Sequence, residues 1–179
     1  MTWSLNNIQE LGSLGVSPHL EKDGDIHQLY YSSIERGGLA IDGMSNDLQL
    51  TQQGNIAHKQ DLTIVTTTEG TRRAYYVEKD PNSGKHEIFT SLISEDGLSL
   101  SEVTSTGITD GSSGQAWGVP DAIILPDGRI RIYWVDEDAA ATTLANEVIL
   151  SATSKTAAGT NFSIDAGRRL EGGYVDFEV

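Results

Sequence analysis

A short sequence pattern is repeated four times in this chain: a polar residue stands at the start of an apolar, strand-like run. The four opening residues are His19, Asp61, Asp121 and Asp176. Self-similarity with a period of about 40 to 60 residues is typical of repeat folds such as solenoids and propellers. The sequence therefore predicts a small unit that recurs, with a polar side chain at the same place in each copy.

The segment after each opening residue supports the repeat. An acidic residue and a glycine come next, and a second β-rich run then ends in two aromatic residues. The three versions are Asp23-Gly24 before Tyr30-Tyr31, Glu69-Gly70 before Tyr75-Tyr76, and Asp127-Gly128 before Tyr133-Trp134. Because glycine accepts the positive φ of a tight turn, each pair predicts a β-hairpin. We expect the aromatic pairs to pack between neighbouring units.

A third and a fourth strand complete each unit, so the predicted fold class is all-β, with four antiparallel strands per repeat. Such units are the blades of a β-propeller, whereas a β-sandwich is the alternative that also has short, regularly spaced strands. We expect one domain over residues 1–179, with blades at approximately 17–56, 57–118 and 119–173. Residues 3–5 resemble an extra outer strand at the N-terminus, and residues 174–179 resemble an extra inner strand at the C-terminus. Residues 136–146 are expected to form a long loop.

Three blades leave a ring open, and an open sheet edge exposes unpaired backbone groups. Two explanations are consistent with the sequence. The chain is part of a longer propeller, or two copies form a homodimer that closes a six-bladed ring.

Charge and composition exclude several classes of partner. The formal net charge is −14, from 26 acidic and 12 basic residues, which disfavours nucleic acid and anionic membranes. No run of apolar residues is long enough to span a membrane, and no signal peptide pattern is visible at the N-terminus. The chain has no cysteine, so it has neither disulfides nor thiol chemistry. These features predict a soluble chain and assign it to no compartment.

The first strand of each propeller blade lines the central axis, so the four opening side chains are expected to meet in one pocket. Neighbouring carboxylates raise one another's pKa, which allows one to act as an acid and another as a base. Asp61, Asp121 and Asp176 are therefore the candidate catalytic residues, and His19 and Trp117 the candidate substrate-binding residues. A purely structural role, capping turns or bonding a neighbouring blade, is the alternative for each of them. The spacing of the four histidines does not suggest a metal site, and no cofactor is expected.

Residues 120–134, with 149–154 and 161–163, resemble blades of the glycosidase-like propellers. That group includes the five-bladed arabinanase- and fructosidase-type enzymes and the six-bladed sialidases. The resemblance implies a carbohydrate ligand and catalysis by acidic residues at the starts of inner strands. None of the four matching positions is glutamate, and His19 stands where an aspartate is expected. The two resulting hypotheses are a glycoside hydrolase that acts through axial carboxylates, and a non-catalytic propeller that binds carbohydrate or protein.

Overall fold

The structure is a computed structural model that describes residues 15–23, 26–82, 84–109, 118–137 and 147–171. These residues form thirteen β-strands, which confirms the all-β prediction. Among them there is no helix with the length and apolarity needed to cross a membrane.

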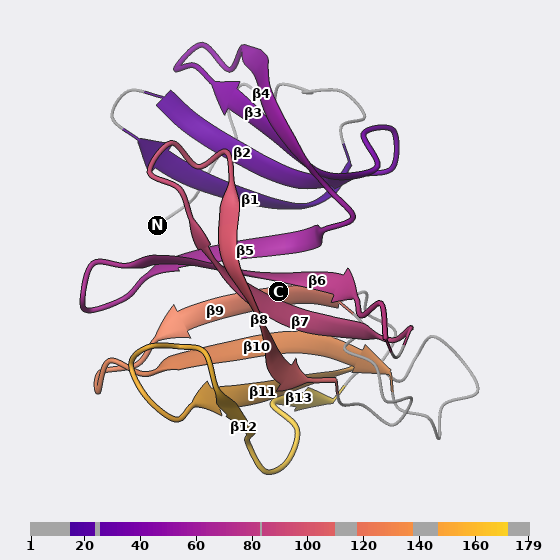
Figure 1. Ribbon diagram of the computed structural model, residues 1–179, viewed down its shortest axis with the longest axis vertical. Coiled ribbons are helices and arrows are strands. Elements are labelled where there is room, and N and C mark those ends of the chain that lie inside the picture. The colour runs from indigo at the N-terminus through magenta and orange to yellow at the C-terminus, as the bar shows by residue number, and fades with distance from the viewer. Residues whose placement is uncertain (1–14, 24–25, 83, 110–117, 138–146, 172–179) are drawn as a thin grey trace, which may run out of the picture.

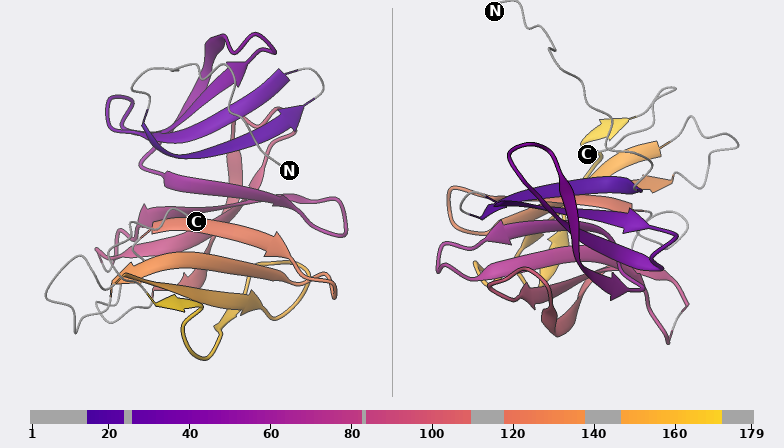
Figure 2. Two further views of the ribbon diagram at one scale, coloured as in Figure 1. Left: turned by 180° about the vertical axis from the view of Figure 1, so that it is seen from behind. Right: turned by 90° about the horizontal axis from the view of Figure 1, so that it is seen from above.

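The strands form three antiparallel sheets that succeed one another along the chain and lie one above the next in Figure 1 and in the left view of Figure 2; in the right view, from above, they overlap. We name the sheets blades A, B and C. Blade A contains β1 (Val16–Asp23), β2 (Ile26–Ser33), β3 (Gly38–Met44) and β4 (Leu50–Ala57). Blade B contains β5 (Gln60–Thr66), β6 (Arg72–Lys79), β7 (His86–Ile93) and β8 (Leu100–Ile108). Blade C contains β9 (Gly118–Ile124), β10 (Ile130–Glu137), β11 (Glu147–Ser154) and β12 (Phe162–Ile164), and the short β13 (Leu170–Glu171) also pairs with β11.

Each sheet is a simple meander, with its strands hydrogen-bonded in chain order. The first strands of the three blades are neighbours, because β5 contacts both β1 and β9. The predicted three four-stranded blades are therefore confirmed, and their opening strands share one side of the molecule. The predicted extra strands at residues 3–5 and 174–179 lie outside the described residues, as does most of the predicted loop at 136–146.

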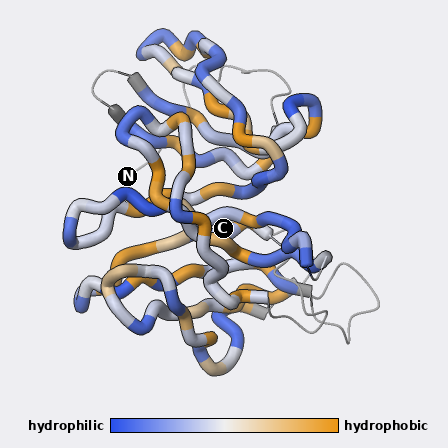
Figure 3. Tube along the Cα trace, viewed as in Figure 1, coloured by the Kyte–Doolittle hydropathy of each residue, from blue (hydrophilic) through white to orange (hydrophobic). Residues whose placement is uncertain are grey.

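The core lies between the blades, where apolar segments follow the strands and polar segments follow the turns (Figure 3). Successive side chains of a strand point to opposite faces of its sheet, so the two members of an aromatic pair pack in different interfaces. In blade B, Tyr76 belongs to the cluster shared with blade A and Tyr75 to the cluster shared with blade C; both are fully buried. Packing of the aromatic pairs between units is thereby confirmed for blade B.

A hydrogen bond repeats at both interfaces. The Tyr30 hydroxyl of blade A is shared between Gln28 Oε1 at 2.9 Å and the carbonyl of Gly97 at 3.2 Å, and Tyr75 of blade B donates to the carbonyl of Gly159 at 2.8 Å. Each acceptor glycine lies in the turn between the third and fourth strands of the next blade, at φ of 74° and 65°. A Cβ on either glycine would collide with the tyrosine hydroxyl that it binds. We call this contact the tyrosine latch.

Candidate functional site: an axial cavity at the strand starts

The three inner strands share an irregular beginning. The pairing register shifts between Val16 and His19 in β1, between Gln60 and Thr63 in β5, and near the start of β9. At each bulge one residue takes a positive φ: Ser17 at 53°, Asp61 at 51° and Val119 at 47°. Left-handed backbone costs a non-glycine residue roughly 1–2 kcal/mol. Conformations of this kind persist only where surrounding contacts hold them, and they cluster at functional sites.

The bulges change which residues are equivalent. His19, Thr63 and Asp121 pair with Tyr30, Tyr75 and Tyr133, respectively, and so occupy the same position in their blades. Asp61 comes two residues earlier, at the left-handed position. The sequence repeat, which aligned Asp61 with His19 and Asp121, is therefore wrong in register by two residues. The sequence alignment matched residue types, an aspartate before an apolar run, whereas the strand pairing places Thr63 opposite the first aromatic residue of blade B.

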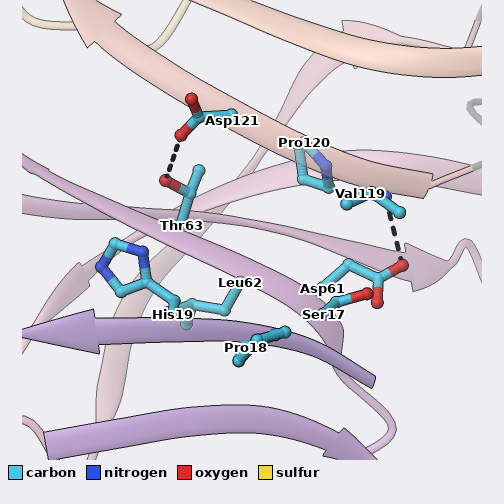
Figure 4. A pocket seen from close by; sticks show the side chains of 9 residues that line it. All are labelled: Ser17, Pro18, His19, Asp61, Leu62, Thr63, Val119, Pro120 and Asp121. Carbon is cyan, nitrogen blue, oxygen red and sulfur yellow. Dashed lines mark hydrogen bonds between the residues drawn. The ribbon is translucent and has the colours of Figure 1, made fainter. Parts of the chain in front are cut away.

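A cavity of about 280 Å³ lies where the three inner strands begin (Figure 4). Its volume is close to the lower end for small-molecule sites, roughly 300–1,000 Å³. Three consecutive residues from each strand line it: Ser17, Pro18 and His19; Asp61, Leu62 and Thr63; Val119, Pro120 and Asp121. The structure thus brings together His19, Asp61 and Asp121 around one space, whereas Asp176 and Trp117 lie outside the described residues.

Asp61 connects all three blades. Its Oδ1 accepts a hydrogen bond from Ser32 Oγ of blade A at 2.9 Å, and its own backbone N–H donates to the same Oγ at 2.8 Å. Its Oδ2 accepts from the backbone N–H of Val119 in blade C at 3.3 Å. A Cβ at Gly118 would come within 2.9 Å of that Oδ2. Both carboxylate oxygens are engaged, so the position of the Asp61 side chain is fixed.

Asp121 is held on one side only. Its Oδ1 accepts from Thr63 Oγ1 at 3.2 Å and from the N–H of Ala122 at 2.9 Å. Figure 4 shows the second oxygen directed away from Thr63, and that oxygen has no hydrogen-bond partner within the described part of the chain. Asp121 therefore keeps capacity to accept hydrogen bonds from a ligand.

His19 also has an unused polar atom. Its Nε2 is buried and has no hydrogen-bond partner among the described residues, and its ring lies 6.1 Å from that of Tyr30. Burial lowers the pKa of His19 below its ordinary 6.5, although Glu21 and Asp121 oppose this by stabilising the charged form. At neutral pH the imidazole is therefore uncharged, and it offers one donor and one acceptor.

A second hollow, of about 560 Å³, adjoins the cavity along the seam between blades A and B and shares Asp61 with it. Its outer part is lined by His58, Glu78, Lys79 and His86. Glu78 is paired with Lys59 at 2.6 Å.

Sequence reasoning missed two residues that shape the site, Ser32 and Thr63. A serine or threonine within a strand gives no signal by itself. Thr63 could have been found from its pairing partner, because it lies opposite the first aromatic residue of its blade, as Asp121 does. Within the described ranges no group of three or more His, Cys, Asp or Glu side chains is placed to hold a metal ion.

Radial four-stranded blades whose polar strand starts meet at an axial cavity define part of a β-propeller. Three solved structures share this fold. The endo-arabinase from Bacteroides thetaiotaomicron superposes with a TM-score of 0.67 at 16% identity, over 92% of this chain and 66% of its own. An endo-1,4-beta-xylanase from the same organism gives 0.65 at 13% identity, over 84% and 53%, and a thermostable family-43 glycoside hydrolase gives 0.61 at 16% identity, over 87% and 55%.

The chain thus spans between 53% and 66% of the length of these structures. At such identities the likeness shows the fold alone. No protein-family profile matches the sequence, and no curated protein matches it either.

Proposed function

We propose that the chain is a carbohydrate-active propeller that binds a sugar in the axial cavity. The observation that carries this proposal is the second oxygen of Asp121, which has no hydrogen-bond partner in the described part of the chain and belongs to a residue that lines one cavity together with His19 and Asp61. Sugar hydroxyls donate and accept together, so a neutral imidazole beside a carboxylate suits them. The apolar Pro18, Leu62 and Pro120 line the same space and suit the C–H face of a sugar ring.

Binding is tested first on a glycan array and then by calorimetry with the strongest ligand. Asp121→Asn keeps the size of the side chain and its acceptor for Thr63 but removes the charge and one acceptor. We expect this variant to bind at least about tenfold more weakly, since a hydrogen bond to a charged group contributes roughly 1.5–3 kcal/mol. The control is Asp127→Asn, in the exposed β9–β10 turn, which should bind as the wild type does. Equal affinity of wild type and Asp121→Asn would contradict the proposal.

Glycoside hydrolysis is a second candidate function of the same cavity. It is supported by the two carboxylates, Asp61 and Asp121, which come from neighbouring inner strands. Hydrolysis of a glycoside generally uses two such groups, about 5 to 9.5 Å apart depending on stereochemistry. Asp121, with one oxygen unengaged, is then the group placed to transfer a proton, while Asp61 is the fixed carboxylate. Asp176 remains a third predicted carboxylate.

Turnover is measured with a panel of aryl glycosides. If the protein is a hydrolase, Asp121→Asn should reduce kcat by roughly 10²- to 10⁴-fold, the usual contribution of a general acid or base. Sugar binding by the wild type without turnover of any glycoside would instead support the non-catalytic binding module.

A further inference from the structure

The charged side chains that line the axial cavity are all negative. Among the nine described residues of the lining, Asp61 and Asp121 are the acidic ones, and none is lysine or arginine. Burial lowers the pKa of His19, which also lines the cavity, below its ordinary 6.5, so its imidazole is uncharged at neutral pH. The described lining therefore carries two formal negative charges and no positive one.

Two cations beside the inner strands are already engaged by other acids. Arg72 forms an ion pair with Glu21 of β1, and Lys59, just before β5, forms one with Glu78 at 2.6 Å. The chain as a whole has a formal net charge of −14. A cavity lined by one sign of charge, in a molecule of the same sign, attracts ligands of the opposite sign. The axial cavity therefore favours a cation over an anion.

The two aspartates differ in what they leave for a ligand. Asp61 uses one carboxylate oxygen on Ser32 and the other on the N–H of Val119. Asp121 uses only Oδ1, which accepts from Thr63 and from the next N–H in the chain. Its second oxygen points away from Thr63 in Figure 4 and has no partner in the described structure. A cationic group thus has one point of attachment, the second oxygen of Asp121.

Apolar residues of the lining strengthen an ion pair at that oxygen. Pro18, Leu62 and Pro120 line the same cavity, and Asp121 itself is half-buried. The attraction between two charges grows as the local dielectric constant falls. A hydrogen bond between an ammonium and a carboxylate is roughly twice as strong as one between neutral groups. A protonated amine therefore binds this oxygen better than a hydroxyl does.

We propose that the ligand of the axial cavity is an amino sugar, whose protonated amine donates to the second oxygen of Asp121. This inference rests on the proposed sugar binding and names the class of sugar. Neutral sugars bind more weakly, because their hydroxyls carry no charge to pair with the aspartate. Sugars that carry a carboxylate, such as uronic and sialic acids, are repelled, since like charges brought together at an interface oppose binding.

The test compares matched pairs of methyl glycosides by calorimetry at pH 7. The pairs are glucosamine with glucose, galactosamine with galactose, and mannosamine with mannose. Within each pair an amine takes the place of a hydroxyl of similar size, so the pair differs in charge and hardly in shape. We expect the amino sugar of at least one pair to bind about tenfold or more tightly than its parent. The methyl glycoside of glucuronic acid should bind more weakly than that of glucose.

Two variants assign the preference to one side chain. Asp121→Asn keeps the size of the side chain but removes its charge, so the preference for the amino sugar should fall to about twofold or less. Asp127→Asn, in the exposed β9–β10 turn, removes the same charge from the whole chain and should keep the full preference. Circular dichroism shows whether both variants are folded, and the comparison of sugars on the wild type needs no variant.

Three results would overturn the proposal and leave the sugar site in place. They are equal affinity within every pair, tightest binding of the glucuronide, and an unchanged preference in Asp121→Asn. Ethanolamine, an amine without a sugar ring, provides a further check. If it binds as tightly as the amino sugar, the cavity recognises a cation and not a sugar. Binding of no sugar at all would instead contradict the proposed function itself, so the two failures are distinguishable.

Discussion

Removal of the Tyr75 hydroxyl tests how much the tyrosine latch contributes. In Tyr75→Phe the aromatic ring stays in the core between blades B and C, and only the hydrogen bond of 2.8 Å to the Gly159 carbonyl is lost. Burial raises the pKa of the Tyr75 hydroxyl well above its ordinary 10, so it remains a donor throughout the working pH range. A buried hydrogen bond contributes roughly 0.5–1.5 kcal/mol net, and a buried carbonyl left unpaired costs about 1–3 kcal/mol. We expect a loss of about 1–2 kcal/mol.

The loss is measured by urea denaturation, in which the midpoint should fall while the slope stays the same. For a chain of this size, 1 kcal/mol corresponds to about 2–4 °C in Tm, so thermal unfolding gives an independent reading. The matched control is Tyr133→Phe, where the same atom is removed from a tyrosine without a latch acceptor in the described structure. We expect that control to lose less than about 0.5 kcal/mol. Equal effects of the two substitutions would refute the latch as a stabilising contact.

The same contacts lead to two further predictions. Gly97→Ala and Gly70→Ala both place a side chain at positive φ, but only the Cβ at Gly97 meets the Tyr30 hydroxyl, while that at Gly70 meets nothing within 4 Å. We therefore expect Gly97→Ala to be less stable than Gly70→Ala by about 1–3 kcal/mol in urea denaturation. Equal stability of the two variants would contradict the latch geometry. Because burial lowers the pKa of His19 below 6.5, the unfolded chain binds the proton first as pH falls, so the stability that depends on neutral His19 is complete above pH 6.5 and is lost on acidification. Unfolding measured between about pH 5 and 8 should show a shallower pH dependence for His19→Gln than for the wild type, and identical profiles would rule out a buried neutral imidazole.

The fold could be predicted because its signals are local and repeated. An acidic residue followed by glycine sets a hairpin, and the period of two in each strand sends one aromatic residue of a pair to each neighbouring blade. Those features reappear in the structure at Tyr75 and Tyr76, which pack on opposite sides of blade B.

The site was predicted only in part, since its details depend on backbone irregularities. The left-handed residues Ser17, Asp61 and Val119 share no residue type, and two of them are types that rarely take positive φ. No alternation of polar and apolar residues records such a bulge. Asp61 was expected to be equivalent to Asp121 because both are aspartates that precede an apolar run, although Asp61 lies at the bulge and binds Ser32 and the N–H of Val119.

This difference separates the roles of the two aspartates, and substitution by asparagine can measure it. Asp61 needs two acceptors, one for Ser32 and one for the Val119 N–H, but asparagine offers only one carbonyl oxygen. Asp61→Asn should therefore lose about 1 kcal/mol of stability, with no added backbone cost because asparagine tolerates left-handed φ. In Asp121→Asn the remaining oxygen can still accept from both Thr63 and Ala122, so stability should change by less than about 0.5 kcal/mol while sugar binding falls. The reverse pattern, a stable Asp61→Asn and an unstable Asp121→Asn, would mean that Asp121 connects the inner strands of the three blades and that Asp61 is the group that faces the ligand.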